Sequence, residues 1–82
     1  QALIDARTAW ERYRGAQRYV ASAEEAARQI ARKYDLGAAT VTDYNAAVSA
    51  QVKARSQLLQ AKYEYLFKIK TLTYYTNYYH GE

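Results

Sequence analysis

The fold of this 82-residue chain is decided by ten residues near its middle, Tyr34-Asp-Leu-Gly37-Ala-Ala-Thr40-Val-Thr-Asp43. Gly37 can take the left-handed backbone conformation that ends a helix. Thr40 can begin the next helix by accepting a hydrogen bond from a free backbone N–H. Asp43, three residues later, resembles the acidic half of a capping box. The stretch therefore predicts a helix, a tight reversal and a second helix.

The segments on either side of this turn each carry a line of apolar residues at alternating steps of three and four. The first line is Ala2, Ala6, Ala9, Tyr13, Ala16, Val20, Ala23, Ala27, Ile30 and Tyr34. The second is Tyr44, Ala47, Ala54, Leu58, Ala61, Tyr65, Leu72 and Tyr75, interrupted by Gln51 and Lys68. Such steps place the side chains on one helix face. They predict an all-α fold, an antiparallel two-helix coiled-coil hairpin with a short glycine-containing turn near 37–40.

The expected organisation is one helical hairpin over residues 1–82, because the chain is too short for a second domain. We expect a helix over about 2–36, a turn over 37–40, a helix over about 41–76 and a frayed tail over 77–82. A two-helix unit of this size has a small core and is marginally stable alone.

Further apolar residues lie off these two lines. They are Leu3, Ile4, Trp10 and Tyr19 before the turn, and Val48, Val52, Leu59, Leu66, Phe67 and Ile69 after it. A two-helix hairpin cannot bury two stripes on each helix, so this pattern favours a larger bundle or a closed ring of helices. The alternative is that they are scattered surface apolar residues, which are common. For the isolated chain we expect self-association, as a dimer forming a four-helix bundle.

The net charge of +4 is not gathered into a run of lysine and arginine. Glu11 with Arg14, and Glu24 with Arg28, are spaced for ion pairs within a helix. No dedicated nucleic-acid face is therefore expected, because phosphate binding needs a stripe of one sign. Weak, salt-dependent nucleic-acid binding stays a third possibility.

Chemistry-bearing residues are few. There is no cysteine, and His80 is the only histidine, so we expect no metal site and no cofactor. No nucleophile–base pair and no glycine-rich phosphate loop are visible, so we expect no enzyme. Gly15, inside the first helix, is compatible with a close helix approach, a slight bend or neutral drift. The tyrosine-rich tail 74–79 suits either a partner-binding patch or contacts within a larger parent protein.

The order of residues from about 30 to 67 resembles the TolC-like outer-membrane factors, the exit ducts of bacterial drug efflux and type I secretion. The pattern consists of the turn residues Tyr34, Gly37, Thr40 and Asp43, then Ala46, Ala47 and Ala54, and then Leu58, Ala61, Tyr63 and Tyr65. The resemblance implies a periplasmic hairpin of a trimeric α-barrel in a parent protein of the outer membrane. The start at Gln1 suggests a fragment or a processed product, and the lack of strand patterns suggests an excised hairpin of the parent. The segment itself has no membrane-spanning stretch.

The resemblance also implies roles for the turn residues. Gly37, Ala38, Ala39 and Thr40 would form the tip that docks the hairpin of a periplasmic adaptor protein, and Asp43 would line the aperture of the duct. Some members have a second aspartate where this chain has Ala46, and an arginine where it has Ala39. A simpler role for Asp43 is to stabilise the helix start, by about 0.3–1 kcal/mol.

Two functional hypotheses follow. The first is a non-catalytic element of a TolC-like channel that docks an adaptor at its tip. The alternative is a free-standing helical hairpin, unrelated to export, that oligomerises or binds a partner helix.

Overall fold

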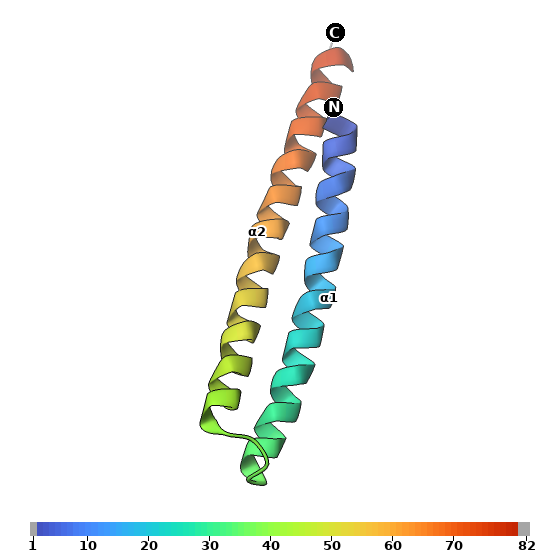
Figure 1. Cartoon of the computed structure of the whole chain (residues 1–82). Coiled ribbons are helices and arrows are strands. Elements are labelled where there is room, and N and C mark those ends of the chain that lie inside the picture. The colour runs from blue at the N-terminus through green and yellow to red at the C-terminus, as the bar shows by residue number, and fades with distance from the viewer. Residues whose placement is uncertain (1, 81–82) are drawn as a thin grey trace.

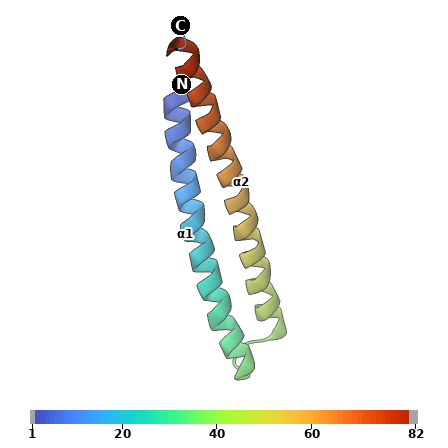
Figure 2. The ribbon, with the colours of Figure 1, turned by 180° about the vertical axis from the view of Figure 1, so that it is seen from behind.

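The computed structural model describes residues 2–80, and the side chains of residues 2–77. It consists of two long helices, α1 (Ala2–Asp35) and α2 (Val41–His80), joined by one short connection. They lie side by side and antiparallel in an elongated rod of 68 × 15 × 13 Å (Figure 1). The view from behind shows the same pairing along the full length of α1 (Figure 2). Residues 2–80 contain no strand, and the predicted all-α hairpin is confirmed.

α1 ends where the glycine signal predicts. Gly37 has a φ of +76°, the left-handed conformation that residues with a Cβ rarely adopt. The Gly37 N–H donates to the Tyr34 carbonyl oxygen at 3.0 Å, and the Ala38 N–H donates to that of Lys33 at 2.7 Å. This pair of bonds is a Schellman motif, which satisfies carbonyls that the end of the helix would leave free.

α2 begins with a reciprocal pair of hydrogen bonds. The Asp43 N–H donates to the Thr40 hydroxyl oxygen at 3.0 Å, and the Thr40 N–H donates to the Asp43 carboxylate at 3.1 Å. This is a capping box with aspartate in the acidic position. Both predicted capping roles are confirmed.

α2 extends to His80, beyond the end that the sequence suggested near residue 76. The helix thus includes residues 77–80 of the tail that the sequence expects to fray, and residues 81–82 lie outside the described residues. Fraying of this tail stays a prediction. The helix continues because residues 41–80 contain neither glycine nor proline. The hydroxyls of Thr71 and Thr76 donate to the carbonyl oxygens of Phe67 and Leu72 one turn earlier, which keeps these groups compatible with a helix.

The interface between the helices follows the two predicted lines. Within the described part of the chain, the buried residues are Ala6, Ala9 and Ala54, at 5%, 2% and 0% exposed. Larger members such as Val20 and Leu58 are half-buried. An interface built on alanine brings the helices together but buries little apolar area per residue, so the hairpin gains modest hydrophobic stabilisation.

A cluster of three aromatic rings joins the helices near the end opposite the turn. Trp10 lies 5.2 Å from Tyr65, measured between ring centroids, and the rings of Tyr13 and Tyr65 stack at 5.9 Å and 15°. The sequence pattern assigned Trp10 to the unpartnered second stripe. That assignment is wrong in part, because Trp10 packs across the hairpin and is 40% exposed. The Arg14 guanidinium lies over its ring at 5.5 Å, a cation–π contact.

Two ion pairs bridge the helices on opposite sides of the interface. Arg12 pairs with Glu64 at 3.2 Å, and Arg55 pairs with Glu24 at 2.9 Å. The expected Glu24–Arg28 pair is wrong, because Glu24 turns to Arg55. Both bridges are exposed, so each contributes about 0–1 kcal/mol and favours one register of the helices.

Arg28 pairs instead with Glu25 at 2.6 Å. The hydrogen bond from the Arg28 guanidinium, and a second from the Gln29 amide, lower the pKa of the Glu25 carboxyl below its ordinary value. Arg28 therefore belongs to a local pair on α1.

Candidate functional site

The tip of the hairpin, residues 36–43, is a closed turn. The Schellman motif ends α1 and the capping box starts α2, with Ala39 between them. Arg32 and Lys33 lie in the last turn of α1, and Asp43 lies in the first turn of α2. Each charge complements the helix dipole at its own end. The turn therefore holds its shape with its own hydrogen bonds.

Two aliphatic side chains project from this turn. Leu36 is 78% exposed and Val41 is 56% exposed. Sequence reasoning did not single them out, although both directly flank the turn motif and lie off the apolar lines. The backbone hydrogen bonds of this turn are made within the turn itself. Its exposed aliphatic side chains are therefore suited to contact another protein.

The predicted docking residues form one continuous surface. Gly37, Ala38 and Thr40 are exposed, and Ala39 is half-buried. A Cβ built on Gly37 would meet no atom within 4 Å, so the glycine is required by the backbone conformation and not by a close neighbour. A ring contact between Tyr34 and Tyr44, with centroids 5.2 Å apart, joins the two helices directly behind this surface. The tip is thereby tied to the helix pair.

Asp43 is exposed, and its carboxylate accepts the hydrogen bond from the Thr40 N–H. The stabilising role at the helix start is thus directly visible. Its second predicted role, lining an aperture, depends on neighbouring hairpins and stays a prediction.

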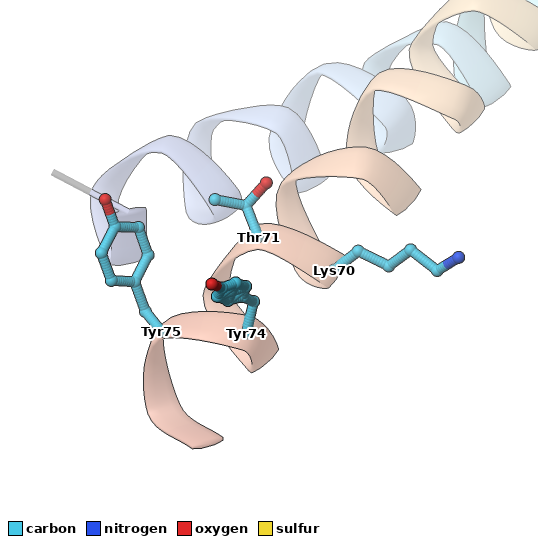
Figure 3. Close-up of a pocket in the computed structure, with 4 residues that line it drawn as sticks. All are labelled: Lys70, Thr71, Tyr74 and Tyr75. Carbon is cyan, nitrogen blue, oxygen red and sulfur yellow. The ribbon is translucent and has the colours of Figure 1, made fainter. Parts of the chain in front are cut away.

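A shallow groove of about 430 Å³ lies near the other end of the rod, lined by Lys70, Thr71, Tyr74 and Tyr75 (Figure 3). All four residues come from α2, and the Lys70 side chain extends away from Tyr75. The Tyr74 and Tyr75 rings lie 6.4 Å apart. Tyr78, Tyr79 and His80 have side chains outside the described set.

Other classes of site leave few signs in the described part of the chain. Among the residues whose side chains are described, the Asp and Glu side chains form no group of three that could hold a metal ion. Over the same residues, neither helix is long and apolar enough to cross a membrane.

Comparison with known proteins gave no match to a family model, to a curated protein or to a solved structure. The function must therefore be argued from the tip and the faces of the hairpin.

Proposed function

We propose that this hairpin is a structural and docking element, the periplasmic tip of a TolC-like outer-membrane duct. The observation that carries the proposal is the tip itself. Gly37, Thr40 and Asp43, the residues on which the resemblance rests, build a self-contained turn that presents Leu36 and Val41 to solvent. Such a turn offers apolar contacts to a partner without needing the partner to complete its backbone hydrogen bonds.

The mechanism is mechanical. Hairpins pack side by side into a ring of three parent protomers, and their tips set the aperture of the duct, with Asp43 facing the passage. The surface 36–41 docks the helical hairpin of a periplasmic adaptor protein. In this proposal the parent protein lies in the outer membrane and this segment lies in the periplasm, and no reaction is catalysed.

The lateral surface of the hairpin supports packing beside neighbours. Leu3, Val52 and Leu59 are 62%, 59% and 53% exposed, although aliphatic side chains of this size gain about 1.5–3 kcal/mol each when fully buried. A hairpin with helices on both sides would bury them.

Binding of the chain to a panel of adaptor hairpins tests the proposal, by titration calorimetry. Leu36→Ser removes the most exposed aliphatic group of the tip and leaves its backbone hydrogen bonds in place. Ile4→Ser is the matched control, since Ile4 is an exposed aliphatic residue, at 59%, that lies away from the tip. We expect Leu36→Ser to abolish binding and Ile4→Ser to retain it. Equal binding by both variants, or no binding by the unmodified chain, would remove the tip-docking claim.

A second function, a free-standing hairpin that oligomerises or binds a partner helix, is supported by the exposed apolar rows of α2. Leu59 and Leu66 are 53% and 45% exposed. Sedimentation of the chain across a range of concentrations tests self-association. A well-folded monomer at all concentrations would count against an oligomer of this chain alone.

A further inference from the structure

The two sides of the hairpin differ in chemistry. On a coiled-coil helix, residues seven apart share a row. Arg12 and Glu24 belong to rows on either side of the apolar line of α1, so the two bridging ion pairs lie on opposite sides of the interface. The side of the Arg12–Glu64 pair has a small groove, about 200 Å³, whose lining is mostly polar and includes Asp5, Thr8 and Lys68. The side of the Glu24–Arg55 pair, which we name the Arg55 face, has a larger groove of about 410 Å³, whose lining is also more polar than apolar. This side differs from the other in the apolar row that α2 carries next to it.

The Arg55 face is apolar along α2. Val48 lies seven residues before Arg55 and lines the groove, opposite the small side chains of Ala27 and Ala31 from α1. The next row outward on α2 is Val52, Leu59 and Leu66, again seven apart, with 45–59% of each side chain exposed. They form a stripe whose members lie two turns apart, with Arg55 and Lys62 between them; Val52 lies beside the groove, and Leu59 and Leu66 lie beyond its end at Arg55.

Cations flank this stripe. Arg28 and Arg55 are already paired with Glu25 and Glu24. Arg7 and Arg14 share the row of Arg28 on α1, and Lys62 lies seven residues after Arg55 on α2; all three are exposed. Within the described residues, none of these three has a carboxylate within ion-pair distance, and Arg14 lies over Trp10. The face therefore carries an uncompensated positive charge beside exposed leucines.

The carboxylates of this face are too few to balance it. Glu24 and Glu25 are engaged by Arg55 and Arg28. Glu11 lies within one turn of Arg7 and Arg14, but within the described residues it forms no ion pair with either, and Asp35 lies far along the helix at the tip end. Two copies joined through this face would bring two such positively charged surfaces together, which disfavours a second copy as the occupant.

We infer that the Arg55 face binds an amphipathic helix whose apolar stripe is flanked by carboxylates. A groove between two packed helices, lined in part by Ala27 and Ala31, suits the shape of a third helix. A helix of about 24 residues, or about 36 Å, would reach from this groove to Arg7, and its carboxylates would meet Arg7, Arg14 and Lys62. A lipid surface would contact Leu59 and Leu66 but leave the groove at Ala27 and Ala31 unfilled. This surface is separate from the tip, so it does not depend on adaptor docking. It includes Val52 and Leu59, so it is the side on which the proposed ring would place a neighbouring helix, and the inference states the chemistry of that helix.

Trp10 reports on this face, because it is the only tryptophan of the chain, is 40% exposed and lies in the same row as Glu24. The test uses the 82-residue chain and two synthetic helical peptides. Both peptides carry the same leucine stripe; one flanks it with glutamates and the other with lysines. We expect the glutamate peptide to shift Trp10 fluorescence saturably and to bind about tenfold more tightly than the lysine peptide, with an affinity that falls as salt rises.

Paired variants test where the peptide binds. Leu66→Gln and Lys62→Gln alter the Arg55 face, whereas Phe67→Gln and Lys53→Gln make the same chemical kinds of change on exposed positions of α2 outside it. We expect about a tenfold loss of affinity for Leu66→Gln, a smaller loss for Lys62→Gln and no change for the two controls, all at unchanged helicity.

Several results would overturn the inference. Equal affinity of the two peptides would mean that charge plays no part. Equal losses in the Phe67→Gln and Lys53→Gln controls would mean that the peptide binds elsewhere. A Trp10 shift with anionic vesicles but with neither peptide would assign the face to a membrane surface. A chain that binds neither peptide but dimerises, and becomes monomeric with Leu66→Gln, would assign it to a second copy.

Discussion

The glycine that reverses the chain provides the sharpest test of the physical argument. Gly37 has a φ of +76°, and an added Cβ there would meet no atom within 4 Å. Gly37→Ala therefore introduces no clash, and its whole cost is the left-handed backbone, about 1–2 kcal/mol for a residue with a Cβ. Asparagine tolerates this conformation better than alanine, so the stability of Gly37→Asn should lie between that of the unmodified chain and that of Gly37→Ala.

Gly15 is the matched control, because it undergoes the same chemical change with the opposite expected sign. It lies inside α1, and an added Cβ there also meets nothing within 4 Å. A close approach of α2 is thereby excluded as the reason for this glycine. Alanine is a better helix former than glycine, so Gly15→Ala should stabilise the hairpin by about 0.8–1 kcal/mol.

Thermal unfolding followed by far-UV circular dichroism measures both variants, at one protein concentration because association would shift the transition. The two melting temperatures should differ in opposite directions from that of the unmodified chain, by about 4–8 °C for each kcal/mol. If Gly37→Ala proves as stable as the unmodified chain, or if both variants shift in the same direction, the left-handed turn does not determine the reversal.

Three further outcomes follow from contacts elsewhere in the hairpin. Thr40→Ala should lower the free energy of unfolding in urea by about 0.5–2 kcal/mol. Because the two capping bonds are reciprocal, the double variant with Asp43→Ala should lose less than the sum of the two single losses. Strictly additive losses would contradict the capping box. Tyr65→Leu should lower the free energy of unfolding by about 0.5–1.5 kcal/mol, because it removes the ring contacts to Trp10 and Tyr13. It should also weaken the near-UV circular dichroism of the chain. An unchanged near-UV spectrum would mean that the cluster does not form in solution. In an NMR titration the Glu25 carboxyl should show a pKa below its ordinary value, and Arg28→Gln should raise that pKa. Because the pKa is lower in the folded chain than in the unfolded chain, this group stabilises the fold above its unfolded pKa. That stabilisation is lost as pH falls through the folded pKa. An unaltered Glu25 titration in Arg28→Gln would argue against the pair.

The turn shows how far local sequence rules reach. Gly37, Thr40 and Asp43 act on backbone groups no more than a few residues away, so their roles follow from spacing alone and appear in the structure as predicted. The exposed Leu36 and Val41 beside them were not predicted, because spacing alone does not show which side chains of a turn remain uncovered.

The sequence by itself determined the two helices, the turn and the apolar lines along which the helices meet, because these depend on backbone propensity and on a repeat of three and four residues. Tertiary structure alone decided that Trp10 packs on Tyr65, that Glu24 pairs with Arg55 and that the leucine row of α2 stays open beside unpaired cations. These outcomes depend on how far one helix slides and rotates against the other. That register is chosen by many weak contacts between residues distant in the chain, and no short stretch of sequence contains it.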